Sequence, residues 1–177
     1  MTLYHFSEEP GIDRFQPRAA RSTLLGDEPL VWAVDEWFAP MYYVPRHCPR
    51  ACFWPGRRTT PEDRERWLGG LEPRFVLAIE SGWLDRLRTA RIYRYAMPEE
   101  SFESMGHEVG HWVSRTAVAP LAIEPMGDLM QAIADAGVEL RITPRLGAMW
   151  GRVSRHSTLE YSGSGLRFAA GYPQEFE

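Results

Sequence analysis

Short apolar and alternating runs follow one another along the chain, separated by turns rich in proline and glycine. Continuous apolar runs, such as residues 30–34 and 75–79, are typical of buried strands. Alternating runs, such as 91–96 and 112–118, are typical of half-buried strands. Together these patterns predict strands at residues 3–6, 30–34, 51–54, 75–79, 91–96, 112–118, 138–142 and 158–161.

Helices are predicted by their start and stop signals. Thr60-Pro61 followed by Glu62 and Asp63 is a strong helix start, and Gly69 ends that helix after about Leu68. The other expected helical segments are an aromatic-rich one after the acidic turn Asp35-Glu36, a short one at 83–87, and two at 128–136 and 144–155.

The order of these elements shows no strict alternation of strand and helix. Seven or eight short strands with three or four flanking helices therefore predict an α+β fold with two small, mostly antiparallel sheets. The length of 177 residues, without repeats or a linker, predicts a single domain spanning residues 1–177.

Composition narrows the function classes. A net charge of −4 argues against a general nucleic-acid binder, which needs a basic surface. No apolar run approaches the roughly 18 residues of a membrane span, and the N-terminus lacks the pattern of a signal peptide. We therefore expect a cytoplasmic protein whose partner is a small-molecule ligand or a nucleotide; the sequence does not specify an oligomeric state.

All 20 basic residues are arginine, so mechanisms that depend on lysine are excluded. A phosphate would have to be held by arginine or by backbone amides. Cys48 and Cys52 are expected to be free thiols, because only His47 stands near them as a further zinc ligand. No metal site is predicted there.

The stretch from Pro29 to Tyr43 combines a buried strand, an acidic turn and several large aromatic residues. Trp32, Tyr42 and Tyr43 can line a flat-walled cleft suited to a planar ring. The alternative is that these aromatic side chains are ordinary core packing.

His107-Glu108-Val109-Gly110-His111 matches the H-E-x-x-H pattern of zinc hydrolases, in which a helix presents both histidines on one face. Its context differs from that pattern, because an acidic, glycine-broken segment precedes it and a strand follows directly. We therefore favour a polar loop before a strand and keep a zinc hydrolase as an alternative.

Several motifs together resemble the ADP-ribosyltransferase-like fold, which includes poly-ADP-ribose polymerases and rifamycin ADP-ribosyltransferases. They are Leu3-Tyr4-His5-Phe6-Ser7, Val31-Trp32-Ala33-Val34-Asp35, Arg91-Ile92-Tyr93-Arg94-Tyr95 and Trp112-Val113-Ser114. Over nearly the whole chain the sequence is also similar to a small bacterial family of uncharacterised proteins.

The resemblance implies NAD as cofactor and a role for individual residues. His5 matches the histidine that binds the ribose, Trp32 the residue that stacks on nicotinamide, and Tyr42 or Tyr43 the second aromatic. The same motifs place Tyr4, Ser7 and Ser114 at the cofactor. Arginines are available for phosphate, as in RNA 2′-phosphotransferases of this fold: Arg18, Arg46 and Arg50.

The catalytic glutamate of that fold should open the strand at Trp112, where this chain has Gly110-His111. His111 can hold the ribose hydroxyl but lacks the fixed negative charge, so Glu108 or Glu160 would have to supply it. The first hypothesis is therefore ADP-ribose transfer from NAD to a small molecule or protein. The second is a non-catalytic ligand-binding protein on the same fold.

Overall fold

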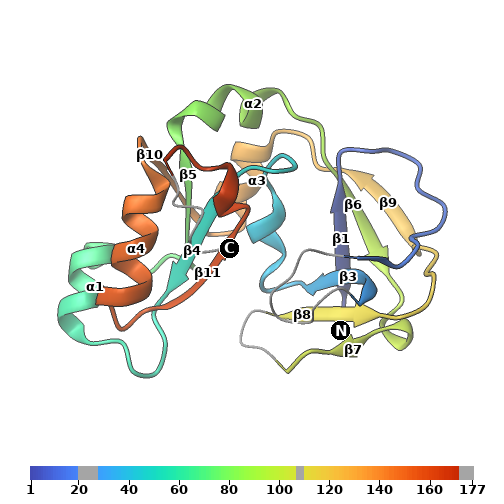
Figure 1. Ribbon diagram of the computed structural model, residues 1–177, viewed down its shortest axis with the longest axis horizontal. Helices are drawn as coiled ribbons and strands as arrows, with labels where there is room; N and C mark the ends of the chain where they lie inside the picture. The colour runs from blue at the N-terminus through green and yellow to red at the C-terminus, as the bar shows by residue number, and fades with distance from the viewer. Residues whose placement is uncertain (20–27, 107–109, 172–177) are drawn as a thin grey trace. The chain divides into compact units, whose positions relative to one another are not determined.

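The computed structural model describes residues 1–19, 28–106 and 110–171. The chain forms two compact units, and each is assembled from two separate segments of sequence. The first unit comprises Met1–Tyr43 with Arg91–Gly127, and the second comprises Val44–Ala90 with Asp128–Glu177. Each unit has a sheet of its own, as the ribbon in Figure 1 shows.

The sheet of the first unit is antiparallel throughout its described strands. Its strand order is β7-β8-β3-β1-β6-β9, and β2 pairs with β3 outside this path. The strands are β1 (Leu3–Ser7), β2 (Arg18–Ala19), β3 (Pro29–Asp35), β6 (Tyr93–Met97), β7 (Glu103–Ser104), β8 (His111–Ser114) and β9 (Ala122–Pro125).

The pairing of β1 with its two neighbours is unequal. With β6 it extends over the whole strand, from Leu3 opposite Met97 to Ser7 opposite Tyr93. With β3 it is limited to Leu3 opposite Asp35 and Tyr4 opposite Val34. The backbone ladder between β1 and β3 therefore ends beside His5.

One face of this sheet carries the core of the first unit. Its buried members are Leu3, Phe15, Val31, Ala33, Tyr95, Met97, Phe102 and Val118. Because successive strand residues point to opposite faces, the other face carries the intervening residues, including Tyr4, Phe6, Trp32 and Val34.

The second unit contains a four-stranded sheet in the order β10-β5-β4-β11. Only the pair β10 and β5 is parallel among these described strands. The strands are β4 (Arg50–Trp54), β5 (Val76–Glu80), β10 (Glu139–Thr143) and β11 (Glu160–Ser164). The α-helices are α1 (Pro61–Leu68), α2 (Leu84–Thr89), α3 (Leu129–Asp135) and α4 (Leu146–His156).

Local chemistry explains where the helices begin and end. The Thr60 hydroxyl accepts from the Asp63 backbone N–H at 3.2 Å, and Gly69 ends α1 in the left-handed conformation. Asp128 caps α3 through the backbone N–H groups of Met130 and Gln131. Helix α1 therefore begins and ends as its sequence signals predict.

Short 3-10 turns complete the two units. They are η1 (Ala39–Tyr42) and η3 (Glu99–Ser101) in the first unit, and η2 (Ser81–Trp83) and η4 (Leu166–Phe168) in the second. The core of the second unit includes Ala51, Phe53, Leu68, Val76, Ala78, Leu146, Val153, Leu159 and Ala169.

The predicted fold class is confirmed at the level of an α+β protein with two mostly antiparallel sheets and four described α-helices. The helical segment predicted after Asp35 is present only as the short 3-10 helix η1 (Ala39–Tyr42). The strand predicted at 112–118 is shorter, and β9 was missed because all four of its residues are exposed and give no apolar alternation.

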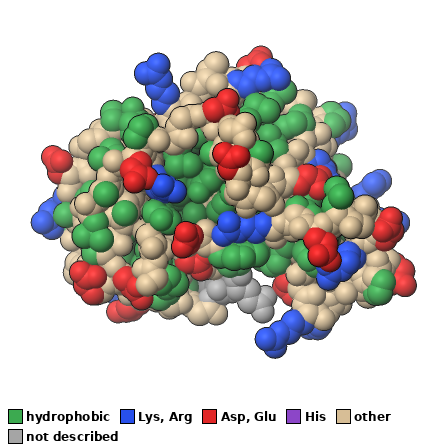
Figure 2. Space-filling model, turned by 180° about the vertical axis from the view of Figure 1, so that it is seen from behind, with side chains coloured by type: hydrophobic (Ala, Val, Ile, Leu, Met, Phe, Trp, Pro, Cys, Tyr) green, Lys and Arg blue, Asp and Glu red, His purple; other side chains and the backbone are tan. Residues whose placement is uncertain are grey.

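Charged side chains of both signs are interspersed over the face shown in Figure 2, with apolar side chains between them. No helix formed by residues 1–19, 28–106 or 110–171 has the length and apolar character needed to cross a membrane.

Candidate functional site

Aromatic side chains gather on the face of the first sheet opposite to its core. Register places Trp32 opposite Val113, and Val34 opposite both His111 and Tyr4, so these residues share a face. The turn η1 adds Tyr42, and Tyr43 follows it. We call this set the aromatic face: Tyr4, Phe6, Trp32, Tyr42, Tyr43 and His111.

The centre of the aromatic face is a hydrogen bond between Tyr42 and His111. The Tyr42 hydroxyl oxygen and His111 Nε2 lie 2.7 Å apart in a partly buried position. The ring of Trp32 stands at 89° to the ring of His111, with centroids 5.8 Å apart. The hydrogen-bonded Tyr42–His111 pair therefore lies next to the large aromatic ring of Trp32.

Phe6 connects the two tyrosines to strand β1. Its ring is nearly parallel to that of Tyr42 at a centroid distance of 6.3 Å, and it meets the ring of Tyr43 edge-on at 5.3 Å. Phe6 was not among the predicted site residues. Its position two residues after Tyr4, in a strand, is the signal that places it on the same face.

The indole Nε1 of Trp32 is buried and has no hydrogen-bond partner within the described part of the chain. Leaving a buried donor unpaired costs about 1–3 kcal/mol, so such groups in native proteins call for an explanation. An acceptor atom of a bound ligand would provide one.

His5 lies apart from the aromatic face. Its Nδ1 is 2.7 Å from the carbonyl oxygen of Trp32, and a carbonyl only accepts, so Nδ1 carries the hydrogen. The ring packs against Phe15, a core residue, at a centroid distance of 4.5 Å. The structure therefore brings His5 to the backbone of Trp32 and not to its indole ring.

Ser7 and Ser114, the two serines predicted to lie at the cofactor, hydrogen-bond within local turns. The Ser7 hydroxyl accepts from the backbone N–H of Glu9 at 3.1 Å. The Ser114 side chain is buried and bonds with the Thr116 carbonyl and backbone N–H. This turn explains why β8 ends at Ser114.

Tyr4, at the border of the aromatic face, makes a cation–π contact with Arg94. The Arg94 guanidinium carbon lies 5.0 Å from the centroid of the Tyr4 ring. Arg94 also donates to Glu124 at 2.5 Å, and this hydrogen bond raises the pKa of Arg94 above its ordinary value. The positive charge there is thus largely matched by a carboxylate.

Three further predicted residues belong to the second unit: Arg46, Arg50 and Glu160. Arg46 is exposed, and Arg50 donates to the Cys48 carbonyl at 3.5 Å. The Glu160 side chain packs directly over Gly56, where an added Cβ would overlap it at 2.5 Å.

Arg18, proposed for phosphate, lies in β2 of the first unit opposite Leu30.

The H-E-x-x-H motif is only partly described, because His107 and Glu108 lie outside the described residues. Gly110 has a left-handed φ of 62°, and His111 pairs with Val34 as the first residue of β8. Neither residue is helical, so the helical spacing on which the zinc alternative depended is not present at this end of the motif. No group of three or more metal-ligating side chains is found among residues 1–19, 28–106 and 110–171.

Gly110 and Asp35 form a close contact that sequence reasoning missed. Asp35 accepts from the backbone N–H of Phe38 at 3.0 Å through its carboxylate and donates to the Gly110 carbonyl at 3.0 Å through its own N–H. A Cβ on Gly110 would overlap the Asp35 carboxylate and the Phe38 ring. The acidic turn thereby fixes the start of β8 and with it His111.

Both cysteines are free and buried. Burial raises the pKa of Cys48 and of Cys52 to about 12, with neighbouring Arg50 acting in the opposite direction on both. The thiols are therefore protonated at neutral pH and are poor nucleophiles and poor metal ligands.

Most of the chain matches a known protein family. Residues 4–169 match a family of unknown function, DUF6886. The chain belongs to this family. The match spans both units, and it confirms the similarity to an uncharacterised family that the sequence indicated. No curated protein and no solved structure matches this DUF6886 member.

Proposed function

We propose that this DUF6886 protein is an ADP-ribosyltransferase-like protein that binds NAD, with the nicotinamide ring at the aromatic face. The observation that carries the proposal is the Tyr42–His111 hydrogen bond set against the ring of Trp32. The resemblance had assigned nicotinamide stacking to Trp32 and the second aromatic position to Tyr42 or Tyr43. Tyr42 contacts His111 and Phe6, which share a sheet face with Trp32, and this supports the assignment.

Nicotinamide suits this set of groups chemically. It is planar, so it can pack on aromatic rings, a contact worth about 0.5–1.5 kcal/mol beyond the buried area. Its carboxamide oxygen is an acceptor, and the buried Trp32 Nε1 is a donor without an acceptor among the described residues. Nicotinamide would thus pack on the aromatic rings and also accept a hydrogen bond from Trp32 Nε1.

Transfer of ADP-ribose breaks the bond between C1′ of the ribose and the nicotinamide nitrogen, and nicotinamide leaves with the bonding electrons. The acceptor nucleophile forms the new bond to C1′ and loses a proton. We assign the uptake of that proton to His111, the histidine of the aromatic face. Tyr42 orients the imidazole by its hydrogen bond to Nε2.

A non-catalytic NAD-binding protein is the second candidate. It is favoured by His111 itself, which opens β8 where the resemblance requires a glutamate. An imidazole gives no fixed negative charge to stabilise the positive ribose in the transition state. Of the two glutamates considered instead, Glu160 lies over Gly56 in the second unit, and Glu108 is outside the described residues.

Nicotinamide release from NAD separates the two candidates. We would compare the wild-type protein with His111→Glu and, as a matched control without charge, His111→Gln. An ADP-ribosyltransferase-like site should release nicotinamide measurably, and His111→Glu should raise the rate by about 10²-fold because it restores the stabilising charge. NAD binding without release in any of the three proteins would favour the non-catalytic candidate. Absence of binding would contradict both.

A further inference from the structure

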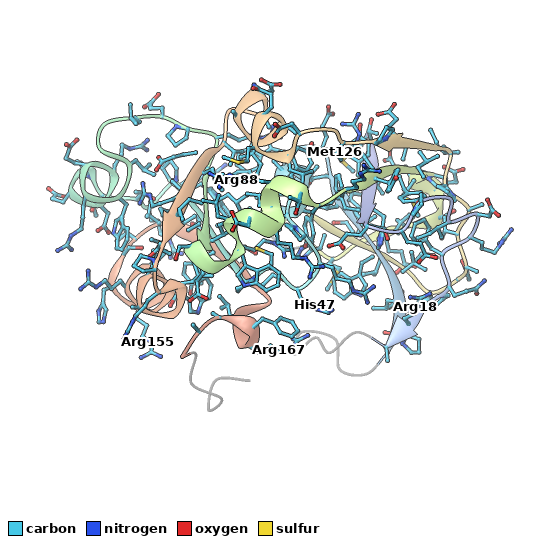
Figure 3. All side chains as sticks on the ribbon, turned by 90° about the horizontal axis from the view of Figure 1, so that it is seen from above. Arg18, His47, Arg88, Met126, Arg155 and Arg167 are labelled. Atoms are coloured by element: carbon cyan, nitrogen blue, oxygen red, sulfur yellow. The ribbon has the colours of Figure 1, made fainter. Side chains whose placement is uncertain are left out.

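We propose that the second unit binds a phosphate group at a cluster formed by the exposed residues His47, Arg167 and Phe168 with the half-buried Arg50, here called the Phe168 cluster. The proposal concerns residues that the NAD proposal does not use, apart from Arg50, and it stands independently of that proposal. Figure 3 labels His47 and Arg167, whose side chains extend at the surface.

One arginine and one histidine side chain pack against the ring of Phe168. The ring is 40% exposed, the Arg167 guanidinium carbon lies 4.6 Å from its centroid, and the His47 ring centroid lies 4.7 Å from it. Neither Arg167 nor His47 has a carboxylate partner within the described part of the chain. A cation held in place by an aromatic ring and not by an acid remains available to an external anion.

The backbone of His47 is strained. With φ at 66°, His47 is the non-glycine residue with positive φ in the described part of the chain. It lies in a turn closed by the Cys48 backbone N–H donating to the Pro45 carbonyl at 3.0 Å. Such conformations cost on the order of 1 kcal/mol and concentrate at functional sites. Since the His47 side chain is exposed, burial does not account for the strain.

Strand pairing brings the other members of the cluster to this turn. Arg50 opens β4 opposite Ser164, the last residue of β11, and donates to the Cys48 carbonyl at 3.5 Å. Gly165 then approaches Cys48 closely, because an added Cβ would lie 3.2 Å from the Cys48 carbonyl oxygen. This close approach positions η4, which carries Arg167 and Phe168, beside the turn.

Two arginines act electrostatically on the Cys48 thiol at the end of this turn. Burial is the largest influence on the Cys48 thiol and raises its pKa to about 12, but the charges of Arg50 and Arg86 act against it. Glu80, the acid that also acts on this thiol, is buried and bonded to two backbone N–H groups. Arg50 and Arg86 are therefore positively charged neighbours of this turn.

A phosphate matches this arrangement better than a carboxylate does. The Arg167 guanidinium carbon and the His47 ring centre lie 4.6 and 4.7 Å from the centre of the Phe168 ring, and both side chains carry N–H groups that can donate to phosphate oxygens. A phosphate also carries nearly two negative charges, which several cationic neighbours can share. In a chain without lysine, arginine provides the bidentate contact.

Calorimetric titration of the full chain tests the proposal, with ADP, pyrophosphate and inorganic phosphate as the three probes. We expect ADP to bind, and Arg167→Ala to weaken it at least tenfold. His47→Gly should weaken binding similarly without lowering the melting temperature, because glycine tolerates the left-handed conformation. Arg152→Ala removes an exposed arginine of α4 and should leave the affinity unchanged.

Each outcome either tests the phosphate site or shows which part of the ligand is recognised. Pyrophosphate binding as tightly as ADP would show that the phosphates alone are recognised, whereas a preference for ADP would indicate a nucleotide; both support the site. Unchanged ADP affinity in Arg167→Ala, or equal weakening in Arg152→Ala, would overturn it. Binding that is lost in Trp32→Ala but retained in Arg167→Ala would overturn it as well and would leave the NAD proposal standing.

Discussion

At the scale of single residues, Gly110 determines how His111 is presented. Its φ of 62° is natural for glycine, and its missing Cβ leaves room for the Asp35 carboxylate and the Phe38 ring. Asp35 in turn bonds to the backbone of both Phe38 and Gly110. The position of His111 therefore depends on the contact of the preceding residue, Gly110, with Asp35 and Phe38.

Gly110→Ala should destabilise the protein by about 3 kcal/mol, because the new methyl group adds overlap to an unfavourable φ. The measurement is urea unfolding followed by circular dichroism. Gly127→Ala is the matched control, since Gly127 also has a left-handed φ of 68° but no atom within 4 Å of an added Cβ. It should cost about 1 kcal/mol. Equal costs for the two variants would contradict a role for the contact with Asp35.

At the scale of elements, Glu80 joins three parts of the second unit. It is the last residue of β5 and is 5% exposed. Its Oε1 accepts from the backbone N–H of Leu146, the first residue of α4, at 3.0 Å. Its Oε2 accepts from the Ala170 backbone N–H at 2.9 Å. The carboxylate thus caps a helix and anchors the segment after η4.

Glu80→Gln keeps the size of the side chain but replaces one acceptor oxygen by a donor. We expect a loss of about 2 kcal/mol, because one backbone N–H loses its acceptor in a buried site. Hydrogen exchange should show faster exchange at Leu146 and Ala170, with β4 and β5 unaffected beyond the global change. Uniform loss of protection across the second unit would contradict the local clamp.

Asp63 links the start of α1 to the segment before β11. Its carboxylate accepts from the Thr158 hydroxyl at 2.7 Å and from the Thr158 backbone N–H at 2.6 Å. These hydrogen bonds, the hydroxyl first, lower the pKa of Asp63 below its ordinary value of 3.8. Thr158 thus connects helix α1 to the segment that leads into β11.

The pH dependence follows from the sign of that shift. Because the folded pKa is lower than the unfolded one, the carboxylate stabilises the fold fully above pH 3.8, and this is lost as pH falls through the lowered folded pKa. The stability difference between wild type and Asp63→Asn should be constant near neutral pH and shrink below pH 3.8. A difference that grows on acidification would contradict this account.

Most of the helices and strands could be predicted from the sequence, but fewer of the residues at which they begin and end. Helix α1 could be predicted from Thr60 and Gly69 because capping is local chemistry. The short length of the helical segment at η1 could not be predicted, because Asp35 bonds to Phe38 and to the distant Gly110 just before it. For the site, the alternation in β3 predicted the sheet face on which Trp32 lies. The sequence did not predict that His5 lies away from the Trp32 indole, because this depends on which face of β1 packs against the core.

At the scale of the whole molecule, neither unit is continuous in sequence. The chain passes from one unit to the other after Tyr43, after Ala90 and after Gly127. Linker composition identifies boundaries between contiguous domains, so interleaved units leave no such signal. The prediction of a single domain over residues 1–177 stays a prediction, and the DUF6886 match over residues 4–169 shows that both units belong to the family.

NAD titration by isothermal calorimetry tests the central claim most directly, because binding is required by both candidate functions. We would compare wild type, Trp32→Ala and, as a control, Tyr161→Ala, which removes a 43% exposed ring of the second unit. The account predicts that wild type and Tyr161→Ala bind equally. NAD at one hundred times its Kd should also stabilise them by about 2.7 kcal/mol. Trp32→Ala should bind at least tenfold more weakly. No binding at millimolar NAD, or equal binding by all three proteins, would contradict a nicotinamide site at the aromatic face.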